Sequence, residues 1–492
     1  MKKFFSVGAL ALALIMGMSS CSKEKGNTPD TPESNLDTYV GVRIAFSGAG
    51  TRTHPDDHNK QPYTWEGRDE IKKITVYLVN TAKGKVDFTT FNKESFEGIN
   101  DGFLKPTLAV KATKGENVKA YAVINDINDL TKSLQDAAAG EFDAKFKELM
   151  VTVKNSSEVG TYSAGSGSGS GSDIVMMTND SEAAEIAEVV QATKEDAIEG
   201  RKNRADIKVS RVVSRAIVTV KKDLTKTIEV KNSNGAKVSE ITIGDITYAV
   251  GQSNLKFFNM HKTDWMTPEP VYSYVPENDW TTKGKTYFDY SDLNSPKAPL
   301  GIINEEVGLK EALGKEEFSK FVLPVTHDTG KYKKGNMTYF EVSCKFEANK
   351  VIDASGERKG VLGEDVYLGM SDGKFYATRE LAGKGQEVTK YKSGVMKYVI
   401  WLNPNGGYAE KVKITESPTV RNQVYHAHIS GFKEIGVPNN PLNPDDPNDP
   451  ENPENPINPN DDPETEKTYL SVSIRVLPWT IHSYSVDLGN RY

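Results

Sequence analysis

The stretch that decides the fold is residues 36–53, LDTYVGVRIAFSGAGTRT. Its large apolar side chains fall on alternate positions: Val40, Val42, Ile44 and Phe46. This period of two predicts a β-strand with one buried face. The small residues that follow predict a flexible loop, and this loop contains Arg52. Because a trypsin-like protease cuts at exposed arginines in flexible loops, we expect residues 36–52 to be a first strand that cleavage detaches.

Residues 1–21 have the pattern of an export signal. Lys2 and Lys3 precede a short apolar run, and Met18-Ser19-Ser20-Cys21 has the form of a bacterial lipobox in which the cysteine accepts a lipid. An ordinary signal peptide with an incidental cysteine is the alternative. The polar residues 22–35 that follow are typical of a tether, so we expect lipidation of Cys21. No other apolar run in the sequence approaches a membrane span.

Cysteine content and charge restrict the possible classes. Cys344 is the only other cysteine, so the chain without its signal cannot form an intrachain disulfide. The net charge is −7, and residues 437–466 hold nine acidic residues with no Lys or Arg, so the rest of the chain is close to neutral. The absence of a basic stripe argues against nucleic-acid binding.

Short alternating runs over 492 residues predict a mainly β fold with two β-sandwich-like domains in tandem and a few short helices. We expect an N-terminal domain over residues 53–222 and a C-terminal domain over 223–436. Strands are predicted at 71–80, 118–125, 209–221, 241–250, 320–324, 337–346, 366–368, 398–402 and 420–431. Phe142, Phe146 and Leu149 have helical spacing, whereas residues 181–194 are ambiguous.

Residues 437–467 form an acidic, proline-rich spacer. Prolines recur at every third position: Pro438, Pro441, Pro444, Pro447, Pro450, Pro453, Pro456 and Pro459. Three residues make one turn of polyproline II, so the prolines line one edge of an extended rod. At about 3.1 Å per residue, the thirty residues 437–466 reach about 90 Å when fully extended. A disordered tail is the alternative, but this segment leads into a strand.

The last segment, residues 468–492, contains two more alternating runs, separated by Pro478-Trp479. Their apolar residues are Leu470, Val472, Ile474 and Val476, then Tyr484, Val486 and Leu488. A long spacer that leads to an amphipathic strand can deliver that strand to a sheet elsewhere. Folding back onto its own domain is the competing interpretation.

Histidines and acidic pairs give weak signals for a metal or catalytic site. His54 and His58 lie beside aspartates in a predicted solvated loop. His426 and His428 share one face of a predicted strand, where we expect a polar outer surface. Because neither pair has a further ligand at metal-site spacing, we expect no metal and no cofactor.

The sequence also argues against an enzyme. The acidic pairs at 305–306 and 316–317 lie in polar stretches, with no sign of an apolar pocket that would raise a carboxyl pKa. A G-x-S-x-G spacing occurs only inside the low-complexity repeat of residues 164–172, without the flanking strand and helix that a nucleophile elbow needs.

The order of these features resembles the fimbrillins of Bacteroidia, which are type V pilus subunits, and in particular the major subunit of the short (Mfa-type) fimbriae. The shared order is Cys21, the strand at 39–46, the loop with Arg52, Trp65-Glu66-Gly67 before the strand at 71–79, VKAYAVIN at 118–125, the strand at 211–220, VRNQVY at 420–425, the Pro-rich linker and a final strand pair. The resemblance spans nearly the whole chain.

The resemblance implies two β-sandwich-like (transthyretin-like) domains and an extended C-terminal donor segment. It implies export as an outer-membrane lipoprotein, attached to the membrane only through the lipid on Cys21. It also implies cleavage by an arginine-specific or trypsin-like protease, which by position falls between Arg52 and Thr53. Arg43 is the other nearby arginine, but it lies in the middle of the strand, where a protease cannot reach an extended, free backbone.

After cleavage, the resemblance implies that the vacated groove accepts residues 468–492 of a neighbour, which builds a head-to-tail pilus at the cell surface. The implied partners are other copies of the chain, accessory anchor and tip pilins, the protease, and host proteins or glycans. An anchor or tip adhesin of the same pilus is an alternative. A glycan-binding surface lipoprotein is another, which the aromatic residues of 272–290 support.

Overall fold

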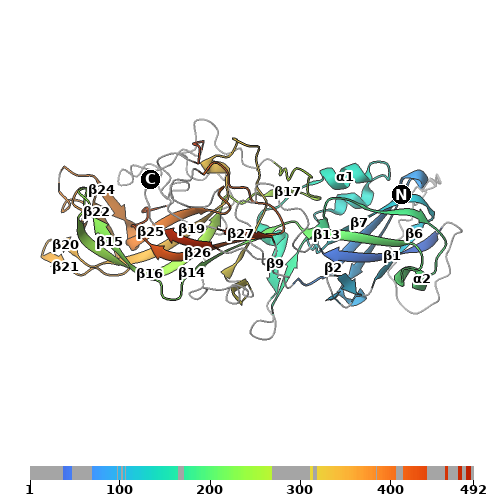
Figure 1. Cartoon of the computed structure of the whole chain (residues 1–492), viewed down its shortest axis with the longest axis horizontal. Helices are drawn as coiled ribbons and strands as arrows, with labels where there is room; N and C mark the ends of the chain where they lie inside the picture. The colour runs from blue at the N-terminus through green and yellow to red at the C-terminus, as the bar shows by residue number, and fades with distance from the viewer. Residues whose placement is uncertain are drawn as a thin grey trace, which may run out of the picture.

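The computed structural model describes residues 37–46, 69–96, 98–100, 103–105, 107–163, 171–268, 311–313, 318–383, 385–405, 414–439, 460–463, 475–478 and 484–488. Predictions for Cys21, Arg52 and Thr53 lie outside these residues. Within them the fold is mainly β, as predicted. Figure 1 shows an N-terminal and a C-terminal group of sheets side by side along the long axis of the molecule.

The N-terminal group contains one large sheet, in which the strand order is β3-β2-β7-β11-β13-β1-β5-β4, while β12 pairs with β7 and β6 pairs with β1. The bounds are β1 (Asp37–Phe46), β2 (Lys73–Asn80), β3 (Lys85–Asn92), β4 (Gly98–Asn100), β5 (Phe103–Lys105), β6 (Leu108–Thr113), β7 (Gly115–Ile124), β11 (Met177–Asn179), β12 (Ala184–Val189) and β13 (Arg204–Arg211). The ambiguous residues 181–194 thus contain a strand, β12.

Both faces of the N-terminal sheet are covered, and β2 shows why its sequence lacks a polar face. Ile74, Val76 and Leu78 pack into one hydrophobic cluster, which β1 shares. Tyr77 and Val79 point to a second cluster on the opposite face. The sequence of such a strand is a nearly continuous apolar run, because neither of its faces is exposed to water.

The second cluster is built on α1 (Phe142–Glu148), which the helical spacing correctly predicts. Phe142 and Phe146 are fully buried, and both pack against the ring of Tyr121, with centroid distances of 5.1 and 4.7 Å. Short strands lie beside this cluster: β8 (Met150–Thr152), β9 (Gly160–Ser163) and β10 (Ser172–Val175). The other α-helix of the described N-terminal part is α2 (Lys194–Ile198), which lies against β1.

The C-terminal group packs two sheets around one core: β18-β14-β26-β27, with β28 also on β26, and β15-β16-β19-β25. A further sheet, β21-β20-β23-β22-β24, adjoins them. The bounds are β14 (Ser214–Val220), β15 (Thr227–Lys231), β16 (Lys237–Gly251), β18 (Lys320–Val322), β19 (Tyr339–Ala348), β20 (Val351–Asp353), β21 (Gly356–Arg358), β22 (Val366–Gly369), β23 (Phe375–Tyr376), β24 (Val388–Tyr391), β25 (Val395–Trp401), β26 (Gln423–Phe432), β27 (Arg475–Pro478) and β28 (Tyr484–Leu488).

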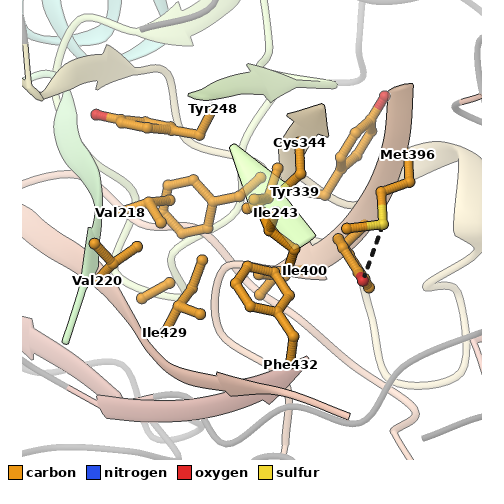
Figure 2. Close-up of a cluster of buried hydrophobic side chains, with 14 of the residues drawn as sticks. Val218, Val220, Ile243, Tyr248, Tyr339, Cys344, Met396, Ile400, Ile429 and Phe432 are labelled. Atoms are coloured by element: carbon orange, nitrogen blue, oxygen red, sulfur yellow. Dashed lines mark hydrogen bonds between the residues drawn. The ribbon is translucent and has the colours of Figure 1, made fainter. Parts of the chain in front are cut away.

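Figure 2 shows the centre of this C-terminal core, where side chains of both sheets meet. Val218 of β14 and Ile429 of β26 come from one sheet, and Ile243 of β16 and Ile400 of β25 come from the other. Cys344 of β19 is fully buried among them, and burial raises the pKa of its thiol. This cysteine therefore contributes to packing as a small apolar side chain.

The predicted single strand at 209–221 is in fact two strands. β13 ends at Arg211 in the N-terminal sheet, and β14 begins at Ser214 in the C-terminal sheet. The buried residues Val212 and Val213 join them without a polar turn, so the sequence shows no interruption. Because β14 packs into the C-terminal core, the chain changes sheets before residue 222. The domain boundary at residue 222 stays a prediction.

The two groups of sheets are also joined by a buried ion pair and by hydrogen bonds. Arg215 of β14 binds Asp173 of β10 with an Nη1–Oδ2 distance of 2.7 Å, and their side chains are 1% and 0% exposed. Arg211 pairs with Asp69 and donates a 2.9 Å hydrogen bond to Asn422 Oδ1. In addition, β17 (Lys256–Phe258) pairs with β8. The junction is therefore a packed, hydrogen-bonded interface.

Candidate functional site

The candidate site is the slot that β1 occupies in the N-terminal sheet (Figure 1). β1 runs parallel to β13 on one edge, with Gly41 opposite Arg204 and Phe46 opposite Val209. On its other edge it runs antiparallel to β6, with Asp37 opposite Thr113, and then meets β5. β1 is therefore an internal strand, and its removal would leave unpaired backbone groups on both neighbours.

The inward side chains of β1 form part of the N-terminal core. Val40, Val42 and Ile44 are each 0% exposed, and Phe46 is half-buried against the same cluster. The predicted alternation is therefore correct for this strand. These side chains hold the strand by burial, because the side chains of Leu78, Val110 and Ile207 surround the same cluster.

Side-chain hydrogen bonds fix the first residues of the strand. Thr38 is 1% exposed, and its hydroxyl donates to the Val190 carbonyl at 2.9 Å and accepts from the Ala192 N–H at 2.8 Å. Asn203, with φ of 49°, donates from Nδ2 to the Tyr39 carbonyl at 2.8 Å. These side-chain bonds define the register of the strand as well as its position.

A steric contact lies near the middle of β1. A Cβ atom on Gly41 would lie 1.8 Å from the Ala197 carbonyl oxygen of α2. The Gly41 N–H also donates to the Asn203 carbonyl at 2.7 Å. Glycine is therefore required here for the close approach of the α2 backbone.

The outward face of β1 is held more weakly. Arg43 Nε lies 2.7 Å from Asp206 Oδ1 of β13, and the guanidinium lies 4.6 Å from the centre of the Phe103 ring. The two charged side chains are 35% and 53% exposed. An ion pair at that exposure contributes little to stability.

The C-terminal strands lie in the C-terminal group of sheets, on β26. β27 runs antiparallel to residues 423–426, with Tyr425 opposite Val476. β28 runs parallel to residues 427–432, with Ile429 opposite Val486. In this single chain the segment thus pairs with its own C-terminal sheet, which is the arrangement of the competing interpretation. Leu470, Val472 and Ile474 lie outside the described residues, whereas Tyr484 and Leu488 lie in β28.

Both described ends of the spacer contact the C-terminal sheets. Val437 and Lys397 of β25 exchange backbone hydrogen bonds of 2.7 and 3.0 Å. Further along, the Lys334 N–H donates to the Asp461 carbonyl at 3.0 Å. The segment between residues 440 and 459 lies outside the described residues.

The two strand histidines differ from the prediction. His426 is 1% exposed, so its predicted place on a polar outer surface is wrong, while His428 is half-buried. Both rings contact the Thr219 hydroxyl of β14, at 2.7 Å for His426 Nε2 and 2.9 Å for His428 Nδ1. Thr219 lies on the neighbouring parallel strand of the same sheet, and periodicity within β26 alone does not reveal this contact. In the part of the chain that the structure describes, no group of three His, Cys, Asp or Glu is placed to hold a metal ion.

Other sequence predictions fall outside the described ranges. These are His54 and His58, residues 164–170, the aromatic segment 272–290 and the acidic pairs at 305–306 and 316–317. Among the helices that the structure describes, none is both long and apolar enough to cross a membrane.

Comparison with known proteins finds similarity over the whole chain. A family model described as "Major fimbrial subunit protein type IV, Fimbrillin, C-terminal" matches residues 389–485, which include β25, β26 and β27. The chain is 29% identical over 523 residues to the minor fimbrium subunit Mfa1 of Porphyromonas gingivalis, and the match covers 99% of each chain.

Solved structures are also similar. The fimbrilin (FimA) of Porphyromonas gingivalis W83 is 13% identical with a TM-score of 0.38, and the match covers 92% of this chain and 97% of that one. A structure of a Parabacteroides distasonis protein, described as a candidate cell adhesion protein, is 12% identical with a TM-score of 0.41, and covers 92% of this chain and 100% of that one.

Proposed function

This chain belongs to the fimbrillin family of Bacteroidia, and we propose that it is a structural stalk subunit of a pilus at the cell surface. The observation that carries the proposal is the position of β1. It is an internal, buried strand of the N-terminal sheet, yet in sequence it is separated from β2 by a segment that contains Arg52. A single cut in this segment detaches β1, while all later strands stay on one continuous chain.

The proposed sequence of events begins with export of the chain as a lipoprotein that carries its lipid on Cys21. Cleavage between Arg52 and Thr53 by an arginine-specific or trypsin-like protease then removes the lipid and releases β1. The vacated slot accepts the C-terminal segment of a neighbour as an added strand. Because each subunit gives a strand at one end and accepts one at the other, the contact does not close and a filament grows.

The energies of the two strands support an exchange. Val40, Val42 and Ile44 are fully buried, and at about 1.5–3 kcal/mol each they contribute about 5–9 kcal/mol of gross burial. Leu470, Val472, Ile474 and Val476 supply an apolar face of similar size. Since neither strand binds the slot much more strongly than the other, cleavage gives the exchange its direction. A detached β1 diffuses away, while a donor strand stays covalently attached to its subunit.

The subunit must also release its own C-terminal strands from β26. Among the described residues, β27 and β28 pair only with β26, so they form an edge of their sheet. An edge strand has backbone partners on one side, which makes its release easier than that of an internal strand. The spacer then gives the released segment its reach to a neighbour.

Replacing Arg52 tests the proposal. Arg52→Ala should leave a folded, lipidated monomer that does not polymerise, as read by electron microscopy and by intact mass. Wild-type pilus subunits should begin at Thr53, while membrane-bound precursor begins at lipidated Cys21. The matched variant Arg201→Ala changes an exposed arginine of another loop and should polymerise normally. Normal pili from Arg52→Ala would exclude cleavage at this residue as the trigger.

A second arm removes residues 468–492. The truncated subunit should still be cleaved but should not form polymers, and polymers from it would exclude the C-terminal segment as donor.

The other roles within a pilus fit the sequence less well. An anchor would retain its lipid and need no cleavage loop, and a tip subunit would need no donor strand, whereas this chain has both features. Accessory anchor and tip pilins, and host proteins or glycans, are the expected partners of the assembled pilus.

A further inference from the structure

We infer that residues 468–476 of a second copy fill the β1 slot in one register, in which each donor residue takes the place of the residue 430 positions earlier. This inference rests on the proposed strand exchange and adds its geometry. The two segments are TYVGVRIAF at 38–46 and TYLSVSIRV at 468–476. They share Thr, Tyr, Val and Ile at the same four positions, and the other two inward positions are apolar in both.

The first requirement of the slot is an apolar side chain at each of the buried positions. In the inferred register, Val472 and Ile474 reproduce Val42 and Ile44 without any change of side chain. A shift of one residue would instead turn Tyr469, Ser471 and Ser473 toward the core, because successive side chains of a strand point to opposite faces. Odd shifts are therefore excluded.

The second requirement is a hydroxyl group at the start of the strand, and it decides among the even shifts. Thr38 satisfies the Val190 carbonyl and the Ala192 N–H, and Thr468 brings the same side chain to the same place. A shift of two residues places either Leu470 or Glu466 there. Leucine would leave the buried Ala192 N–H without its partner, whereas the Val190 carbonyl would keep the hydrogen bond from Asn203 Nδ2. Glutamate would bury a charge.

The third feature is the one mismatch that matters sterically. Ser471 takes the place of Gly41, where a Cβ atom would meet the α2 backbone at 1.8 Å. The donor can enter only if α2 moves outward. α2 is a single short helix that begins with the exposed residues Lys194 and Glu195, but Ala197 itself is 0% exposed, so this movement has an energetic cost. Glycine thus gives the intact β1 an advantage, which delays exchange until cleavage.

The change at the outward Arg43 position does not oppose the register. Ser473 replaces Arg43 and so loses the ion pair with Asp206, but that pair is exposed and contributes little. The direction of the donor also follows: it runs parallel to β13 and antiparallel to β6, as β1 does.

Disulfide trapping tests the register. Tyr39 lies opposite Lys111, with Thr113 and Ala109 two positions away on either side. A donor subunit with Tyr469→Cys is mixed with cleaved acceptor subunits that carry Lys111→Cys, Thr113→Cys or Ala109→Cys, and cross-linked dimers are scored on non-reducing gels. Cross-linking with Lys111→Cys should exceed that with either neighbour by about tenfold, because directly opposite residues have the Cβ spacing that a disulfide needs. Cys344 is buried and is present in every variant, so mixtures in which only one of the two subunits carries an introduced cysteine serve as the background control.

Dominant cross-linking at Thr113→Cys or Ala109→Cys would overturn the register by showing a shift of two residues, and polymers that cross-link at none of the three positions would overturn it as well. Either result leaves strand exchange itself in place. If wild-type subunits form no polymer after cleavage, the proposed function fails together with the register.

Side-chain variants of the donor supply a second test. Thr468→Val should make the donor leave the polymer about tenfold faster, whereas Thr468→Ser, which keeps the hydroxyl, should stay within about twofold of wild type. Ser471→Gly should polymerise faster than wild type, because α2 need not move. The melting temperature of each monomer shows that it folds. A Thr468→Val rate equal to wild type, or a Ser471→Gly rate below it, would overturn the inferred placement.

Discussion

β1 and the C-terminal strands have nearly the same sequence pattern, yet they occupy different kinds of place. β1 lies inside a sheet, with β13 on one edge and β6 and β5 on the other. β27 and β28 are short strands that follow β26 in opposite directions, antiparallel and then parallel. The same alternation of apolar residues therefore serves one strand that holds a core together and one that lies at a sheet edge. Sequence pattern decides what a strand can pair with, and position in the sheet decides how readily it leaves.

Truncation should reveal the largest difference in stability between the two kinds of strand. A chain that begins at residue 69 lacks β1 and loses about 5–9 kcal/mol of burial, which is comparable to the whole stability of a typical domain. We expect its N-terminal core to unfold. A chain that ends at residue 467 should keep both cores and melt only a few degrees lower. Circular dichroism during heating compares the two, and equal losses would contradict the assignment of internal and edge strands.

Breaking the ion pair between the two groups of sheets should give the next largest loss of stability. Asp173→Asn leaves Arg215 buried without its counter-charge, which should lower the free energy of unfolding by about 3–5 kcal/mol. We expect the single melting transition to separate into one for each core. Asp206→Asn is the matched control, because its partner Arg43 is exposed, and it should cost less than about 1 kcal/mol. Calorimetry distinguishes the two, and similar losses would contradict a buried clamp.

The glycine of β1 sharpens the comparison further. Gly41→Ala places a methyl group against the Ala197 carbonyl and should cost about 1–3 kcal/mol in urea unfolding. Gly140→Ala, where the added Cβ has no atom within 4 Å, should change stability by less than about 0.5 kcal/mol. An unchanged stability of Gly41→Ala would show that α2 gives way without resistance.

Acid should weaken the N-terminal core slightly, in part through Glu70. Burial opposes the ionisation of Glu70, but hydrogen bonds from Lys72, Lys93 and Ser172 outweigh it and lower its pKa to about 2. A lowered pKa stabilises the fold at neutral pH, and this contribution disappears as the pH falls from about 4.5 to about 2. After allowance for solvent screening, we expect protonation of Glu70 to lower the free energy of unfolding by about 1 kcal/mol.

Glu70→Gln should remove this acid dependence from the melting of the N-terminal core, as followed by calorimetry at stepped pH. The C-terminal core, which contains none of these four groups, is the internal control. An equal acid effect in wild type and variant would assign the loss to other carboxylates.

Much of the fold can be predicted from short-range patterns. Alternation places Val40, Val42 and Ile44 in the core, and the spacing of Phe142 and Phe146 predicts α1. These predictions succeed because each element buries one face, and the period of its apolar residues records that face. The family is also apparent from the order of weak motifs along the chain.

The remaining features depend on contacts between distant segments. The buried His426 contacts Thr219 of another strand, and residues 209–221 divide because two sheets meet there. In the candidate site, the sequence does hold a signal that alternation alone misses. Thr38 has the same parity as Val40, so its hydroxyl points inward, and Gly41 interrupts the outward face where α2 approaches. A polar inward residue and an outward glycine are signs of specific partners.

The direct passage from β13 into β14 has a mechanical consequence. Only Val212 and Val213 separate the two strands, so the chain passes from one sheet into the next across two residues. In a filament, tension would enter through the amino-terminal end of a donor strand and leave through the carboxyl end of β13. Since these strands are parallel in the inferred arrangement, the load would shear all their backbone bonds together rather than open them one by one, which is the geometry in which a hydrogen-bonded ladder resists force best.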